Sequence, residues 1–488
     1  MIIKNQESDR IINMLDSYDE LETSMILRDI VKAFKVDADR MEDLWDEYQG
    51  DTPIKYRKQY NSDKIISKLS SGMRFELVQQ GVSYFTGVPI KYDIEKTNYA
   101  ETQYDKIIAE INRFNKINNI ADLDNDSSEY ASVCGYSGRL MLVNTKGILR
   151  CMNIRPWECH FVYDSVLDEL QYGFVIYKAD YILDKKVQKR YVVEIYDKTT
   201  VRIYFQDAKN NYIPSPIHEP NVFPHMFNEV PLIKILNNNV ETGDFEIVSE
   251  LIDAYDTLIS DSQDELIQYR MAILALINTG IKKEDIAILK EKGLLSLKTI
   301  DKGLPVDAKF IVKDMPVAYL KEQKDTLKQH IYKGAMAVDF ADPVFQSSPE
   351  SGIARLLKMM NLEGKRIIKE RKFTKALNQQ FIIFADYWKK KQLIFDPSDL
   401  QLQFTRNLPT DLAYYSAVVA NLKETVSYTT LYDLLPFVED PEKEFQKMIL
   451  EVNMYKKSLS NNIIQSTLNN TEVQNNQPED LDDESTGE

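Results

Sequence analysis

The stretch Cys134–Arg139 has the small and polar residues from which a nucleophilic serine turn could be built. Such a turn reads Gly-x-Ser-x-Gly, and here Gly135 and Ser137 occupy the first two defined positions. Arg139 stands where the second glycine belongs, so the motif fails. We expect Gly135 and Gly138 to permit close backbone packing instead, and we predict no catalytic residue.

The acidic run Asp122–Asp126 opens like a calcium-binding loop. However, Ser127 replaces the glycine that makes the sharp turn, and Val133 stands where a bidentate glutamate belongs. We interpret this run as a solvated loop, with adventitious Ca²⁺ binding as the alternative.

Thiols and imidazoles could in principle form a zinc site. The candidates are Cys151, Cys159, His160, His218 and His225. No Cys-x-x-Cys pair is present, and zinc sites usually rely on such spacing. A Walker A sequence, which would indicate a nucleotide-hydrolysing P-loop, is also absent. We therefore expect no cofactor, no metal and no enzymatic activity.

Composition narrows the function classes further. The 488 residues include 76 acids and 60 bases, for a net charge of −16, which argues against a protein that grips nucleic acid over its whole surface. Three cysteines cannot form a disulfide framework and indicate a reducing compartment. The N-terminus has no secretory apolar region, and the longest apolar run, Met271–Ile277, is far too short to span a membrane.

The elements that would position these residues change character along the chain. Apolar residues at helical spacing predict helices over 26–48, 65–84 and 104–115. From about 130 to 236, short runs rich in β-branched and aromatic residues predict an antiparallel β-rich body. The polar break Asn237–Asn239 closes it.

Two long helices are predicted to bracket a small β-containing insert. Residues 245–270 place an apolar stripe on one helix face and acids on the other. The stripe includes Leu251, Ile252, Tyr255 and Leu258, and the acids are Glu246, Glu250, Asp253, Asp256, Asp261, Asp264 and Glu265. The second helix, 316–338, is mostly polar. These helices are either a solvent-bridging or coiled-coil arm, or a pair that packs against identical copies in a ring.

The remaining third of the chain is predicted to be largely helical. Residues 339–351 form a loop, and 352–388 form a very long helix with a basic face. Its bases are Lys358, Lys365, Arg366, Lys369, Arg371, Lys372 and Lys375, which could be solvated, could pair with acids, or could contact DNA phosphate. A strand at 401–404 and helices at 410–424, 427–435 and 441–457 follow, before an acidic tail expected to be disordered.

Ordered short segments resemble the portal proteins of tailed double-stranded DNA phages, in the long-tailed branch of that family. The segments are Tyr48–Asp51, Tyr84–Ile90, Gly135 with Ile154–Pro156, Phe161–Asp164, His225–Pro231, Asn237–Asn238, Leu251–Asp256, Ser260–Asp261, Ser351–Ala354, Phe404–Pro409 and Val426–Thr430. Each is weak alone, but their order over some 400 residues is specific.

The resemblance implies an α+β portal fold with an α/β wing, a helical stem, a small β-containing clip, a long helix above a tunnel loop and a helical crown. By position these parts are wing 1–244, first stem helix 245–270, clip 271–313, second stem helix 314–338, tunnel loop 339–351, long wing helix and strand 352–408, crown 409–457 and acidic tail 458–488.

The resemblance also implies a ring, typically of twelve subunits, around a DNA channel at one capsid vertex. Its partners would be other copies of the chain, double-stranded DNA without sequence specificity, the terminase large subunit, the head–tail adaptor, and the major capsid and scaffolding proteins. The protein would assemble in the host cytoplasm and reside in the virion, with no membrane partner.

Three groups of residues are assigned roles on this basis. We expect Lys321, Lys324, Lys328, Gln346, Ser347 and Ser348 to line the channel, where an excess of acids would let DNA slide. We expect Lys282, Lys283 and Lys290 to help dock terminase or adaptor. An isolated subunit should expose the apolar patch Leu251, Ile252, Tyr255 and Leu258, which ring formation would cover.

The sequence departs from the family pattern in the loop. Phe345–Glu350 is longer and less rich in glycine and asparagine than the usual run, which puts in doubt which loop residue lies closest to DNA. Two alternatives stay open: another structural protein of the phage head, or a nucleic-acid-processing enzyme.

Overall fold

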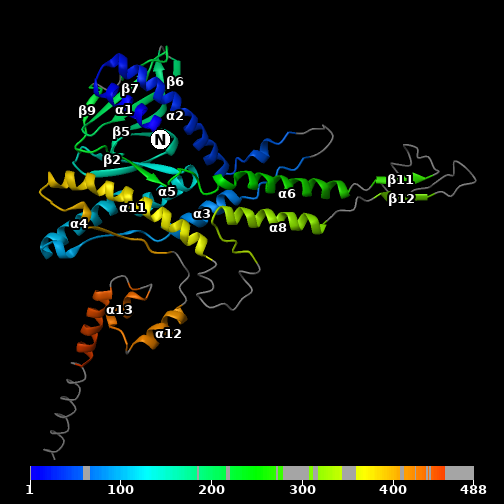
Figure 1. The fold of residues 1–488 in the computed structure, drawn as a ribbon. Coiled ribbons are helices and arrows are strands. Elements are labelled where there is room, and N and C mark those ends of the chain that lie inside the picture. Colours follow the sequence, from blue (N-terminus) through cyan, green and yellow to red (C-terminus); the bar gives the residue numbers. More distant parts are fainter. Residues whose placement is uncertain are drawn as a thin grey trace, which may run out of the picture. The chain divides into compact units, whose positions relative to one another are not determined.

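Figure 1 shows a computed structural model of the chain. It describes residues 2–58, 66–183, 186–215, 220–270, 273–277, 307–311, 317–342, 359–406, 412–423, 425–435, 438 and 441–456. The chain divides into two compact units, Met1–Asn407 and Leu408–Glu488.

The first unit mixes helices with antiparallel sheets, as expected of an α+β protein. Its helices are α1 (Ile2–Asp16), α2 (Glu20–Tyr48), α3 (Met73–Thr86), α4 (Glu101–Asn118), α5 (Ile120–Cys134), α6 (Ser249–Arg270), α8 (Val317–Gly334) and α11 (Met360–Lys389). The second unit contains α12 (Leu412–Leu422), α13 (Tyr428–Asp433) and a helix over 441–456.

The predicted β-rich body is present as two sheets. The larger has the order β4-β5-β6-β7-β8, with β9 also paired to β7, and the smaller has the order β10-β2-β3. Every pairing in them is antiparallel. The strands are β2 (Tyr136–Val143), β3 (Leu149–Ile154), β4 (Cys159–Tyr163), β5 (Leu170–Leu183), β6 (Lys186–Tyr196), β7 (Thr200–Gln206), β8 (Tyr212–Pro214), β9 (Val222–Pro224) and β10 (Leu232–Leu236).

The smaller sheet separates two hydrophobic cores. Successive side chains of a strand point to opposite faces, and β10 follows this rule. Leu232 packs in the core shared with the larger sheet, α2 and α3. Ile233 and Ile235 pack in the second core, which includes α4 and the C-terminal half of α11. β10 therefore contributes side chains to both cores, and the smaller sheet lies between the larger sheet and α11.

Two short strand pairs complete the first unit. β1 (Lys91–Ile94) pairs with β13 (Leu400–Gln403), which joins the N-terminal part of the chain to the segment after α11. β11 (Ile273–Ile277) pairs with β12 (Asp307–Ile311) at the far end of the α6–α8 hairpin (Figure 1).

Gly135 makes a contact that no other residue could make. Its φ of 96° lies in the left-handed region, and a Cβ there would lie 2.0 Å from the carbonyl oxygen of Glu241. A Cβ on Gly138 would lie 2.6 Å from the sulfur of Cys159. The expectation that these glycines permit close backbone packing is confirmed.

Two predictions of local structure are wrong, and one helix was missed. The acidic run 122–126 lies within α5 and is not a solvated loop, because Arg139 compensates the buried Asp124. The helix predicted from residue 65 begins only at Met73, since residues 66–72 form no regular secondary structure. α1, which has a weak apolar periodicity, was not predicted.

Candidate functional site

The α6–α8 hairpin is the candidate site, because it corresponds to the two long helices that bracket the insert. α6 has 22 residues and α8 has 18, so they extend about 33 Å and 27 Å. α6 leads away from the sheets and α8 leads back toward them, so the two helices are antiparallel (Figure 1). At the base of the hairpin, a Cβ on Gly334 would lie 2.7 Å from a methyl of Val248, so the close approach requires glycine.

The three lysines predicted on α8 differ in their surroundings. Spacing of three and four residues places them along one helix face. Lys321 is exposed and Lys324 is half-buried. Lys328 forms an ion pair with Asp339 at 2.6 Å, and its ammonium lies 5.7 Å from the ring centre of Tyr332. Burial lowers the pKa of Lys328, but the hydrogen bond and charge of Asp339 raise it more, with a net rise. Whether these lysines line a channel stays a prediction.

The other predicted lining and docking residues lie outside the described residues. These are Gln346, Ser347 and Ser348 in the loop, and Lys282, Lys283 and Lys290 in the insert.

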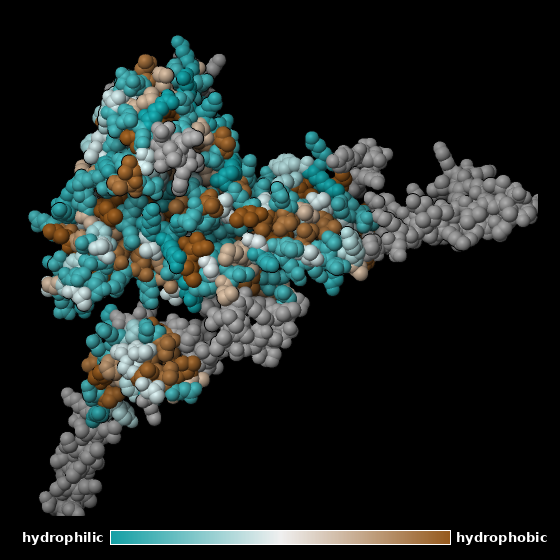
Figure 2. All heavy atoms as spheres, viewed as in Figure 1, coloured by the Kyte–Doolittle hydropathy of each residue, from teal (hydrophilic) through white to brown (hydrophobic). Residues whose placement is uncertain are grey.

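The predicted apolar patch on α6 needs a correction. Ile252 is fully buried within the subunit, and Leu251 and Tyr255 pack partly against the same core. Ile252 therefore cannot belong to a patch that an isolated subunit exposes, because the body of the same chain already covers it. Leu258 is half-buried and does not belong to that core. The hairpin still exposes apolar side chains, among them Leu266 and Val317, and Figure 2 shows apolar surface on it.

Several acids of α6 bind cations of the same chain. Asp253 accepts a hydrogen bond from Arg74 at 2.7 Å, and Asp261 accepts one from Arg57. Glu246, just before α6, forms an ion pair with Arg40 at 2.6 Å. The acidic face is thus partly neutralised within the subunit.

The basic face predicted on the long helix is only partly available to DNA. Lys365 and Lys369 are buried and lie 3.3 and 2.7 Å from Asp244. Burial lowers the pKa of Lys369 to about 8 even though Asp244 opposes this. Burial raises the pKa of Asp244, but the charges of Lys365 and Lys369 outweigh burial and lower this pKa to about 2. These two lysines are not available to contact DNA phosphate, because their ammonium groups are buried beside the carboxylate of Asp244.

The other bases of the long helix differ again. Arg366 pairs with Glu363 and Glu370. Arg371 and Lys375 are exposed and Lys372 is half-buried, while Lys358 lies outside the described residues.

A buried polar network joins α5, the smaller sheet and α11. Arg139 is fully buried and lies 2.8 Å from Asp124, which is 2% exposed. Arg139 also donates to Ser127 and Gln380, each at 3.0 Å. Tyr92 donates a hydrogen bond to Asp124. The one sequence signal of this network was that Arg139 occupies the position of the second glycine in the Gly-x-Ser-x-Gly motif.

Among the described residues, the candidate zinc ligands do not come together into a metal site. No group of three His, Cys, Asp or Glu residues that could hold a metal occurs among the described residues, and His218 lies outside them. The three cysteines are free thiols. Burial raises the pKa of Cys151 to about 11 and lowers that of His160 to about 4, as expected of side chains whose polar atoms are shielded from solvent.

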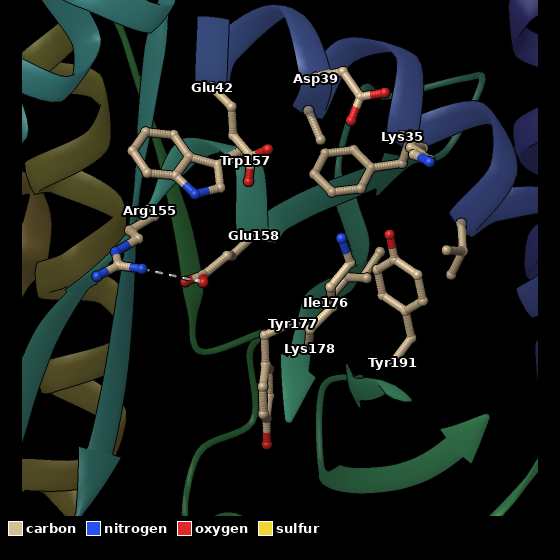
Figure 3. Close-up of a pocket in the computed structure, with 13 residues that line it drawn as sticks. Lys35, Asp39, Glu42, Arg155, Trp157, Glu158, Ile176, Tyr177, Lys178 and Tyr191 are labelled. Carbon is tan, nitrogen blue, oxygen red and sulfur yellow. Dashed lines mark ion pairs between the residues drawn. The ribbon is translucent and has the colours of Figure 1, made fainter. Parts of the chain in front are cut away.

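A pocket of about 180 Å³ lies between α2 and the larger sheet (Figure 3). Trp157 and Tyr177 border it, and Arg155 forms an ion pair with Glu158 at 3.7 Å. Burial raises the pKa of Glu158, Arg155 opposes this, and Glu42 adds to it. Three acids and three bases line the pocket, so its charge favours no class of ligand.

Within the described ranges, no helix is both long enough and apolar enough to span a membrane.

Comparisons with known proteins concern most of the chain. The family model described as phage portal protein, SPP1 Gp6-like, matches residues 27–458. The chain is 24% identical over 408 residues to the portal protein of Bacillus phage SPP1, covering 79% of this chain and 76% of that protein. It is 23% identical over 235 residues to the portal protein of Clostridium phage phiCD119, covering 46% and 49%.

Among solved structures, the chain is similar to one in the neck of a native GTA particle computed with C12 symmetry. The TM-score is 0.39 at 10% identity, covering 74% of this chain and 88% of that one.

Proposed function

The chain belongs to the SPP1 Gp6-like family of phage portal proteins, and we propose that twelve copies form a ring around a DNA channel at one capsid vertex. A separate terminase packages the genome through this ring, and the genome later leaves by the same route. The ring also seats the head–tail connector. The observation that carries this proposal is the family match over residues 27–458, which covers most of the first unit and extends into the second.

The α6–α8 hairpin is the proposed channel wall. Two observations support this proposal. The two antiparallel helices leave the body together, and the strand pair β11–β12 lies at their far end. In this proposal Lys321, Lys324 and Lys328 line the channel with loop residues Gln346, Ser347 and Ser348. In this proposal an excess of acids faces the channel and the lysines make only weak, averaged contacts, because DNA must slide and each phosphate held by a lysine adds affinity.

The partners follow from this role. The ring contacts duplex DNA without reading its sequence, the terminase large subunit, the head–tail adaptor, and the capsid and scaffolding proteins. It assembles in the host cytoplasm, and its contribution is structural, with the motor activity supplied by terminase.

The assembly is tested by sizing chromatography of the full-length protein with light scattering, followed by negative-stain imaging. We expect a ring with an axial hole wide enough for duplex DNA. A monomer that cleaves DNA in a metal-dependent way would overturn the proposal in favour of a nucleic-acid-processing enzyme.

Docking is tested at the insert. We expect reversing the charges of Lys282, Lys283 and Lys290 to lower packaging or head–tail joining by roughly tenfold, since an ion pair between two proteins is commonly worth about 1 kcal/mol or less and about 1.4 kcal/mol corresponds to tenfold. Rings of the variant should look normal in images. The control reverses Lys35, an exposed lysine of α2 far along the chain from the insert. Unchanged titres of filled and tailed particles would contradict the docking role.

A further inference from the structure

Residues 66–72 form neither helix nor strand, and three hydrogen bonds attach them to α6. The alternation of these bonds indicates an extended conformation over residues 67–71. The backbone N–H groups of Ser67, Leu69 and Ser71 donate to side chains of α6. Their acceptors are Oδ1 of Asp264 at 2.7 Å, Oγ of Ser260 at 3.0 Å and Oδ1 of Asp256 at 2.8 Å. The extended segment runs antiparallel to the helix, since the residue numbers rise along one and fall along the other.

The spacing of these bonds follows from the geometry of the two elements. Every second residue of the extended segment donates, and two extended residues advance about 6.6 Å. Every fourth residue of α6 accepts, and four helical residues advance about 6.0 Å. The two repeats differ by about 0.6 Å per step, which side chains can absorb. One edge of an extended chain therefore matches one face of a helix over three steps.

Two of the three acceptors are buried within the subunit. Asp256 and Ser260 are both 0% exposed, although they lie on the face that the sequence marks as polar. The Ser260 hydroxyl donates to the carbonyl of Asp256 at 2.8 Å, so its lone pairs face the extended segment. The backbone N–H groups of this partly exposed segment have no helix or strand partner, and these side chains supply acceptors in place of a neighbouring strand.

Two arginines bind acids of α6 next to these acceptors. Arg57 binds Asp261 and lies 3.9 Å from Asp264. Arg74, only 2% exposed, binds Asp253 and also Glu47 of α2. Gly72, with a φ of 74°, then turns the chain into α3. The segment thus connects α6 to α2 and α3 in the body.

We propose that residues 66–72 are a strap that fixes the angle between the first stem helix and the wing, with Asp256, Ser260 and Asp264 as its latch. This rests on the proposed function only in naming stem and wing. The angle matters for a ring, because each copy meets its neighbours through faces whose mutual inclination sets how many copies close the circle. The strap is a positioning element and does not touch DNA.

The first test is hydrogen exchange of the full-length protein at single-residue resolution by mass spectrometry. We expect the amides of Ser67, Leu69 and Ser71 to exchange at least about tenfold more slowly than those of Lys68 and Ser70, because only the former are donors to α6. In Ser260→Ala, only Leu69 should lose its protection. In the double variant Ser260→Ala/Asp264→Ala, Ser67 should lose it as well.

The second test measures ring number by native mass spectrometry. The double variant should give a broader distribution than the unaltered protein. Glu250→Ala is the matched control, since it removes one acid from the exposed part of the same helix and should change neither result.

Uniformly fast exchange over 66–72 would overturn the strap itself, and an unchanged ring distribution in a variant with a released strap would overturn its positioning role. If the unaltered protein forms no ring, the proposed function fails while the exchange pattern still decides the strap. The single variant Ser260→Ala keeps the exchange test valid if the double variant does not fold.

Discussion

Single charged residues hold together elements that are far apart in the chain. Asp124 compensates Arg139, and Asp244 compensates Lys365 and Lys369. Burying a charge costs several kcal/mol unless a partner is present, so each such pair depends on both members. Removing one member should do more damage than removing any surface charge.

The carboxylate of Asp244 provides the sharpest case. Asp244→Ala would leave two ammonium groups buried beside no counter-charge, and we expect a loss of about 3–5 kcal/mol of unfolding free energy. Urea unfolding followed by tryptophan fluorescence measures it. Arg371→Ala, an exposed change on the same helix as the lysines, should stay within about 0.5 kcal/mol. Equal effects of the two changes would show that Asp244 is not the central partner of the lysines.

The pH dependence of stability is set in part by His160. Burial, with a contribution from Lys234, lowers the pKa of His160 to about 4 from its usual 6.5. The unfolded chain therefore binds a proton between these values that the folded chain does not. The stability contribution is fully present above about pH 6.5 and is lost as the pH falls towards 4.

Thermal unfolding between pH 7 and 4 tests this dependence. We expect His160→Gln to flatten the fall in midpoint temperature, whereas His330→Gln, at an exposed position of α8, should leave the slope unchanged. The same slope in all three proteins would mean that other groups control acid sensitivity.

At the scale of elements, Gly334 sets how closely α8 can approach Val248, the residue just before α6. Gly334→Ala should cost about 1–3 kcal/mol, because its Cβ would overlap a branched side chain at 2.7 Å in the base of the hairpin. Gly364→Ala provides the opposite case on α11. Its Cβ would meet only the flexible end of Met336 at 3.4 Å, so higher helix propensity should stabilise by about 0.5–1 kcal/mol. Calorimetry of both variants checks the signs, and two changes of the same sign would refute the packing explanation.

At the scale of the whole molecule, Leu258 remains the candidate for subunit contact on α6. It is half-buried outside the core that contains Ile252. If a neighbouring copy covers it, Leu258→Asp should shift the protein from ring to monomer on a sizing column by at least about tenfold in dissociation constant. Thr257→Asp, at an exposed position beside it, should not. Intact rings of Leu258→Asp would remove this residue from the interface.

Local patterns in the sequence were enough for much of the architecture. Short runs rich in β-branched and aromatic residues from about 130 to 236 predicted the antiparallel sheets, and helical periodicity predicted α2, α6 and α8 to within a few residues at most ends. These patterns depend on neighbours in the chain, so they are legible without the fold. The order of short segments also indicated the portal family, which the family model bears out.

Tertiary structure alone decided which polar residues are buried. Asp124, Lys369 and Asp256 have the chemistry of surface residues, and their partners lie 15, 125 and 185 positions away in the chain for Arg139, Asp244 and Ser71 respectively. A charge enters a core only when a distant group compensates it, and no local pattern encodes that pairing. Residues 66–72 are not helical for the same reason, because the acceptors of their hydrogen bonds belong to a helix that begins far along the chain.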